Sequence, residues 1–426
     1  MKKILVIVLA VILTLTLSLA GVTLADNGWK SHYLTMTDYC VCGEGNNPCC
    51  CCGPSSGVSI GWYYKTRDPA QYGCNYPNLP STQSKMYDAL YDYMDTSPIF
   101  RCYTDPFYYG YGFLEMTRRA GYYNFSFVAK GQYSGNVIWG GKVASEDFWT
   151  IKNAIDNGWP VALVGNFKDV YEISGDETGT WPCTVGHYIA IRGYKYYDGG
   201  SYTSNRSIFC TDSYSHSDML ELDWDVVVQK TLGLQFYIIK DEIRENFEWG
   251  NNGDSLSTSG GNVAWTVSTG GSSYAQIDAY IIHNGTRSGR FYRDGSNFVQ
   301  AYYSEYQPIW RGFWLKKDLN AVFYTRTGDG AHSILVRVLN SASGGKLQYY
   351  YNGAWKDTGC SITDTNWHFI EFRVIDWWAY GHDYSIYVDN NWVKSGVHMY
   401  AETAYNGITA YYSDSGTGSF WIDDIP

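Results

Sequence analysis

The sequence predicts two domains of different fold class, an α+β domain over residues 28–240 and an all-β sandwich over residues 245–426. The length of 426 residues is that of two or three domains. Up to about residue 240 the chain mixes helical and strand patterns. After Glu245 it shows only short alternating runs between Gly, Asn, Asp and Ser clusters, which is typical of antiparallel β proteins.

The composition excludes several classes of protein. Hydrophobic residues make up 45% and charged residues 17% of the chain, which excludes a disordered protein. The net charge of −11 argues against a nucleic acid partner. An aromatic share of 18%, with 41 Tyr and 17 Trp, suits β-sheets and surfaces that stack on sugar-like ligands.

Residues 1–25 have the pattern of a signal peptide. Two lysines follow Met1, an apolar run covers Ile4–Leu19, and Thr23-Leu24-Ala25 is a small-x-small cleavage site. We therefore expect a secreted or cell-surface protein with no membrane span after cleavage. An uncleaved anchor is the alternative, because Ile4–Leu24 nearly suffices to span a bilayer.

The cysteine pattern fits export. There are 11 cysteines, and six of them lie between Cys40 and Cys52. In an exported chain the default expectation is disulfides, with one odd thiol left for chemistry. A zinc cluster at Cys40–Cys52 is the less favoured alternative, since no His lies near.

Two segments of the first domain have helical spacing. Gln83–Thr96 places Met86, Leu90, Tyr93 and Met94 on one face, and Ser145–Asn157 repeats the pattern with Ser145 as the expected N-cap. Three further segments have strand patterns: Pro160–Val164, His187–Tyr194 and Ser207–Thr211.

Twelve short strands are expected after Glu245, enough for one β-sandwich of the jelly-roll type. They are Val263–Val267, Ala275–Ile281, Arg290–Arg293, Phe298–Tyr302, Gly312–Leu315, Ala321–Arg326, Ser333–Val338, Lys346–Tyr351, His368–Val374, Tyr384–Val388, Gly407–Tyr411 and Ser419–Ile422.

Candidate catalytic residues surround Cys52. This cysteine is followed by Gly53-Pro54-Ser55-Ser56, which predicts a nucleophile at a helix N-terminus, where proline is tolerated and the helix dipole favours the thiolate. A structural disulfide is the competing interpretation.

A thiolate nucleophile needs a base and an orienting group. His187 lies 135 residues after Cys52 at the head of an apolar run, and Asp212 ends a neighbouring strand pattern. His187 is alternatively a strand histidine with no catalytic role, His216 is an alternative base, and Asp212 is alternatively a turn residue.

Four motifs together resemble the papain-like cysteine peptidases related to the bacteriocin-leader-processing (double-glycine) peptidase family. They are Cys52-Gly53-Pro54-Ser55-Ser56, Asn157-Gly158-Trp159-Pro160-Val161, Gly186-His187-Tyr188 and Thr211-Asp212, in family order over residues 40–240.

This resemblance implies a papain-like α+β domain in which Cys52 is the nucleophile, His187 the general base and acid, and Asp212 the orienting residue. The family usually has a Gln six residues before the Cys, where its amide helps to form the oxyanion hole. Here Asn46 holds that position and offers a shorter amide.

The second domain resembles concanavalin A-like (laminin-G-like) jelly rolls, through Glu245–Gly250 at its start and Phe420–Ile425 at its end. The resemblance implies binding of a glycan or protein and, in some members, a structural Ca²⁺. Glu248, Asp254 and Asp423 are candidate oxygen ligands, with solvated turn carboxylates as the alternative. The aromatic residues Trp377, Trp378 and Tyr380 are candidates for stacking on sugar rings, with a role in the core or at a sheet edge as the alternative.

These observations predict a secreted cysteine peptidase or amide hydrolase that acts on a peptide or protein through an acyl-enzyme, with no cofactor for catalysis. Its sandwich would bind a glycan or protein. The alternative is a non-catalytic extracellular surface-binding protein whose papain-like domain is degenerate.

Overall fold

The structure is a computed structural model. It describes residues 29–425 except 38, 40–51, 73, 97–103, 134–135, 140, 168–169, 171–185, 199–204, 212–219, 242–246, 258–262, 284, 305–309, 329–331, 375–382 and 402–407. The predicted signal peptide therefore lies outside the described residues. Within the described ranges, no helix is long and apolar enough to cross a membrane.

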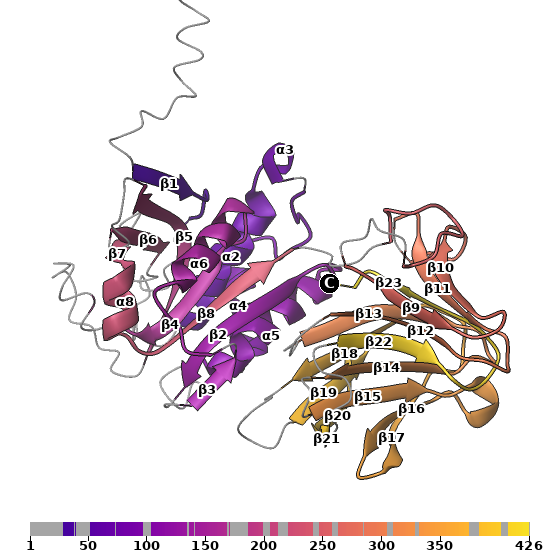
Figure 1. Cartoon of the computed structure of the whole chain (residues 1–426). Helices are drawn as coiled ribbons and strands as arrows, with labels where there is room; N and C mark the ends of the chain where they lie inside the picture. The colour runs from indigo at the N-terminus through magenta and orange to yellow at the C-terminus, as the bar shows by residue number, and fades with distance from the viewer. Residues whose placement is uncertain are drawn as a thin grey trace, which may run out of the picture.

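The N-terminal unit is built on one mainly antiparallel sheet with the strand order β3-β2-β8-β4-β5-β6-β7, and β1 pairs with β5 (Figure 1). The strands are β1 (Trp29–Tyr33), β2 (Ser126–Tyr133), β3 (Asn136–Trp139), β4 (Val161–Asn166), β5 (His187–Tyr197), β6 (Arg206–Thr211), β7 (Leu220–Asp223) and β8 (Leu232–Lys240). The helices are α2 (Cys52–Thr66), α3 (Pro69–Tyr72), α4 (Gln83–Tyr93), α5 (Pro106–Arg119), α6 (Asp147–Asp156) and α8 (Trp224–Lys230).

Both predicted helices are present, but one begins differently from the prediction. Helix α4 starts after Thr82, whose side chain caps the Lys85 N–H, and it buries Met86 and Leu90. Helix α6 has Glu146 as its N-cap, so the prediction of Ser145 is wrong. The Ser145 carbonyl instead accepts hydrogen bonds from Arg206 and Trp224, which come from distant parts of the chain.

A β-bulge in β5 changes which of its side chains point to each face of the sheet. The register with β6 slips by one residue between Ile191 and Gly193, so the side chains beyond it point to the other face. Before the bulge, Tyr188 stacks on Tyr109 of α5, and after it Tyr194 contacts Phe148 of α6. Helices α5 and α6 therefore cover opposite faces.

The C-terminal unit is a sandwich of two antiparallel sheets, ordered β10-β11-β23-β13-β18-β19-β20 and β17-β16-β15-β14-β22-β12-β9 (Figure 1). The first sheet contains β10 (Tyr274–Asp278), β11 (Ser288–Arg293), β13 (Trp310–Lys317), β18 (His368–Val374), β19 (Asp383–Val388), β20 (Asn391–His398) and β23 (Gly418–Asp423). The second contains β9 (Thr266–Thr269), β12 (Val299–Ser304), β14 (Phe323–Gly328), β15 (His332–Val338), β16 (Lys346–Tyr351), β17 (Ala354–Ser361) and β22 (Ile408–Ser413), and β21 (Tyr400–Ala401) pairs with β15.

Each of the twelve predicted sandwich segments overlaps an observed strand. Their alternating residues meet between the sheets, where Phe313, Phe323, Tyr411 and Phe420 form part of one buried core. Strands β17, β20 and β21 were not predicted. Strand β21 has only two residues, and β17 and β20 are sheet edges with mostly exposed side chains, so they lack the alternation of apolar and polar residues that reveals a half-buried strand.

The two units are joined by a buried interface between α5 and the outer face of β13, β18 and β19 (Figure 1). Glu371 forms ion pairs with Arg118 of α5 and with Arg373 of its own strand, and Arg373 also pairs with Glu115 at 2.9 Å. The Tyr111 hydroxyl donates to the Val374 carbonyl at 2.6 Å. The sandwich is therefore fixed against the N-terminal unit through this face.

We predict that Glu371→Gln destabilises the whole chain. The substitution leaves Arg118 and Arg373 buried without their shared carboxylate, a loss that costs about 3–5 kcal/mol for buried ion pairs. Urea unfolding followed by tryptophan fluorescence measures the change. Glu115→Gln is the matched control, because it removes the pairs with Arg373 and with the exposed Arg119 but leaves Glu371 in place, and it should cost less. Equal stability of Glu371→Gln and the original chain would contradict the importance of the cluster.

A second charged group lies at the turn that follows β19. His368 bonds through Nδ1 to Asp389 at 2.7 Å and through Nε2 to Asp364 at 2.9 Å. The hydrogen bond with Asp389 raises the pKa of His368, and Asp364 adds to this against the opposing effect of burial. Its neighbour Phe369 packs on Tyr123 of the N-terminal unit.

Protonation of His368 should therefore stabilise the folded chain. Because the folded pKa lies above the unfolded value of about 6.5, the contribution is complete below that pH and is lost as the pH rises through the folded pKa. We expect the difference in unfolding free energy between the original chain and His368→Gln to fall by roughly 1 kcal/mol or less from pH 5.5 to pH 8.5. Urea titrations at both pH values measure it, and a constant difference would refute this role.

Candidate functional site

The first candidate site is the N-terminus of α2, as the sequence predicts. Cys52 is the first residue of this helix and is partly exposed, whereas the residues that follow it are buried. A Cβ atom at Gly53 would lie 2.4 Å from Thr104 Oγ1, so only glycine allows this close approach. The Gly53-Pro54 sequence thus both starts the helix and lets it pack tightly beside the cysteine.

Tyr109 of α5 lies next to this helix start. Ser56 Oγ donates to the Gly53 carbonyl at 2.9 Å and is also 2.9 Å from the Tyr109 hydroxyl. Since serine has a single hydroxyl proton, Tyr109 is the donor of that second bond. Burial raises the pKa of Tyr109 and the charge of Cys52 adds to the increase, against the effect of the Ser56 bond, so the phenol stays protonated.

His187 is the first residue of β5, the strand on which α2 packs, and its side chain is 3% exposed. It pairs with Gly165 of β4. The next residue, Tyr188, stacks on Tyr109 with ring centroids 4.9 Å apart and donates to the Thr104 carbonyl. Tyr109 and Thr104 therefore connect the start of α2, which carries Cys52, to the start of β5, which carries His187.

Other predicted catalytic residues fall outside the described residues. These are Asp212, Asn46 and the alternative base His216. Strand β6 is described up to Thr211, which pairs with Ala190, three residues after His187. The third histidine of this unit, His32, bonds Asp156 at 3.0 Å. Sequence reasoning missed Tyr109, which has no motif of its own and is recognisable only through its three-dimensional contacts.

The cysteines differ from the expectation of disulfides where they are described. Cys52, Cys74, Cys210 and Cys360 are thiols. The prediction of disulfides is therefore not confirmed for these four cysteines. The remaining cysteines lie outside the described residues: Cys40, Cys42, Cys49, Cys50, Cys51, Cys102 and Cys183.

The three carboxylates proposed as Ca²⁺ ligands each accept hydrogen bonds from backbone N–H groups in different segments of the chain. Glu248 accepts from the backbone N–H groups of Thr286 and Arg287, and Asp254 accepts from that of Asn251. Asp423 is buried and accepts from the His283 N–H at 3.0 Å. No cluster of three metal-ligating side chains occurs among the described residues.

The predicted stacking residues Trp377, Trp378 and Tyr380 lie outside the described residues. A different aromatic group occupies the outer face of the sheet that contains β14 to β17. Trp355 contacts Tyr350 with ring centroids 5.2 Å apart and Tyr324 at 5.8 Å, and Tyr324 stacks on Tyr412 at 4.9 Å. We call Tyr324, Tyr350, Trp355 and Tyr412 the aromatic face.

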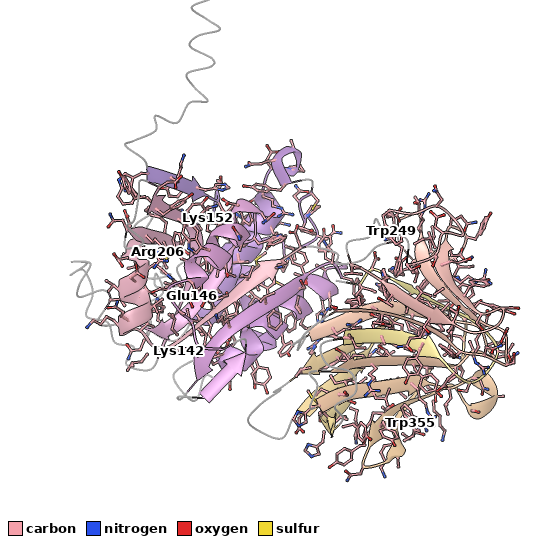
Figure 2. The ribbon with its side chains drawn as sticks, viewed as in Figure 1. Lys142, Glu146, Lys152, Arg206, Trp249 and Trp355 are labelled. Atoms are coloured by element: carbon pink, nitrogen blue, oxygen red, sulfur yellow. The ribbon has the colours of Figure 1, made fainter. Side chains whose placement is uncertain are left out.

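The aromatic face points away from the N-terminal unit. The interface uses the other sheet of the sandwich, and Figure 2 shows Trp355 at the end of the sandwich remote from that unit. Trp355, Tyr350 and Tyr412 are partly exposed, whereas Tyr324 is buried beneath them. A flat ligand can therefore reach three of the four rings.

No family model matches the chain, and no curated protein matches it. Several solved structures are similar to part of it. A carbohydrate esterase from the Shiga toxin-encoding bacteriophage phi24B is 15% identical with a TM-score of 0.28, covering 38% of this chain and 88% of its own. The cellulose induced protein Cip1 is 12% identical with a TM-score of 0.30, and the match covers 43% of this chain and 94% of Cip1. TmCBM61 in complex with β-1,4-galactotriose is 16% identical with a TM-score of 0.23, and the match covers 43% of this chain and 92% of TmCBM61.

Proposed function

We propose that the sandwich is a carbohydrate-binding domain and that the aromatic face is its binding surface. The observation that supports this is the group of partly exposed rings around Trp355, on the sheet that the N-terminal unit leaves uncovered. Sugar rings present C–H groups on their faces and hydroxyl groups at their edges, so they pack on aromatic rings bordered by polar side chains. The external location that residues 1–25 predict suits such a ligand.

Trp355→Ala should abolish binding of the full chain to polysaccharides. Affinity electrophoresis through gels containing xylan, galactan, arabinan or polygalacturonate measures it, with retardation expected in at least one gel. Trp392→Ala is the matched control, because Trp392 is 64% exposed and lies on β20 in the other sheet. Retardation unchanged by Trp355→Ala, or none in any gel, would refute the proposal.

We propose as a second function that the N-terminal unit is a thiol-dependent amide hydrolase. The supporting observation is that Cys52 begins α2, that His187 begins β5, and that these two elements pack on each other. Unpaired N–H groups and the dipole at a helix N-terminus favour the thiolate, which is the attacking species.

In the proposed reaction the Cys52 sulfur attacks the carbonyl carbon of an amide while His187 takes the thiol proton. His187 then returns the proton to the leaving amine, and an acyl-enzyme remains. Water attacks this thioester, which releases the carboxylic acid and restores the thiol. A peptide bond in a protein is the substrate class that the family resemblance implies. A non-catalytic surface-binding protein is the alternative.

Alkylation by iodoacetamide separates these two functions. Under mildly reducing conditions we expect Cys52 to react faster than Cys360, whose pKa is raised by burial.

His187→Gln should slow the reaction of Cys52 selectively, and Cys52→Ala should abolish cleavage of fluorescein-labelled casein. Cys74→Ala is the control that removes another partly exposed thiol. Cleavage unaffected by Cys52→Ala would refute the nucleophile, and a Cys52 no faster than Cys360 would favour the non-catalytic alternative.

A further inference from the structure

Arg337 contributes a positive charge to the aromatic face. The guanidinium carbon of Arg337, on β15, lies 4.1 Å from the centroid of the Trp355 ring. Its Nε donates to Gln348 Oε1 on the neighbouring strand β16 at 2.9 Å. The stacking and the hydrogen bond together fix the plane of the guanidinium group, and a guanidinium held in this way loses little freedom when it binds a ligand.

The two terminal nitrogens of Arg337 are available for a ligand. They carry four N–H groups, and none of these bonds to another group in the part of the chain that the structure describes. The residue is partly exposed, so the groups reach solvent beside Trp355. Two parallel N–H groups of a guanidinium match the two oxygens of a carboxylate.

The charges around Arg337 leave this site positive. The register places Arg337 and Lys346 on the same face of the sheet, and among the described strand residues of that face the one carboxylate is Asp357. Asp357 pairs with Lys346 at 3.0 Å, so its charge is compensated within the sheet. A local excess of positive charge in a chain of net charge −11 favours a specific anionic ligand.

We propose that the ligand of the aromatic face is an acidic glycan that contains uronic acid residues. The uronate carboxylate would bind the two terminal nitrogens of Arg337 while the sugar ring lies against the exposed edges of Trp355 and Tyr350. The Gln348 side-chain NH₂ can donate to a sugar hydroxyl, because Gln348 uses its carbonyl oxygen for Arg337. This inference rests on the proposed carbohydrate binding and adds the chemical class of the sugar.

Calorimetric titration of the full chain with hexagalacturonate and with its carboxyl-reduced counterpart tests the proposal. We expect hexagalacturonate to bind at least about tenfold more tightly, which is the contribution of a charge-assisted hydrogen-bonded pair. Arg337→Gln should remove this preference, so that the two hexasaccharides bind with equal affinity. Arg337→Lys keeps the charge but loses the planar fork, so it should retain only part of the preference.

Lys356→Gln is the matched control. Lys356 follows Trp355 in β17 and is exposed, but its side chain points to the other side of the strand, so the substitution removes a cation that lies outside the proposed site. Circular dichroism and thermal melting verify that each variant is folded. Equal binding of both hexasaccharides, or binding of neutral polysaccharides without hexagalacturonate, would refute the acidic ligand and leave carbohydrate binding intact. Equally tight binding of a dextran sulfate oligosaccharide would refute carboxylate recognition. Absence of binding to every sugar would refute carbohydrate binding itself.

Discussion

The packing of α5 is the constraint on which the rest of the structure depends. Its first turn carries Tyr109, which bonds Ser56 beneath the start of α2 and stacks on the strand that begins with His187. Its last turn carries Arg118, whose ion pair with Glu371 is buried in the sandwich interface. One helix of fourteen residues therefore positions both the thiol and the second domain.

The sandwich packs on the N-terminal unit through one of its sheets, so the outer face of the other sheet remains for a ligand. The outer face of β13, β18 and β19 is occupied by α5 and Tyr123, which contacts Trp314 and Phe369. The aromatic face belongs to the other sheet. A ligand on that sheet would therefore not compete with the interface between the two units.

The sequence predicted the features that depend on local patterns. Helix α2 begins at Cys52 because Gly-Pro starts helices, and α4 follows from the spacing of Met86 and Leu90. The prediction that Ser145 is the N-cap of α6 is wrong, since Glu146 holds that position, and the Ser145 carbonyl accepts bonds from residues 61 and 79 positions away. No local pattern in the sequence reveals such partners.

The binding surface escaped prediction for the same physical reason. Arg337, Gln348 and Trp355 lie on three successive strands, and only their antiparallel register brings the guanidinium over the indole. Strand β17, which supplies Trp355, is an edge strand with polar residues on both sides, so the sequence did not mark it as a strand. Edge strands need exposed polar side chains to avoid pairing with other chains. The same exposure makes an edge strand hard to recognise from sequence and leaves its aromatic residue accessible to a ligand.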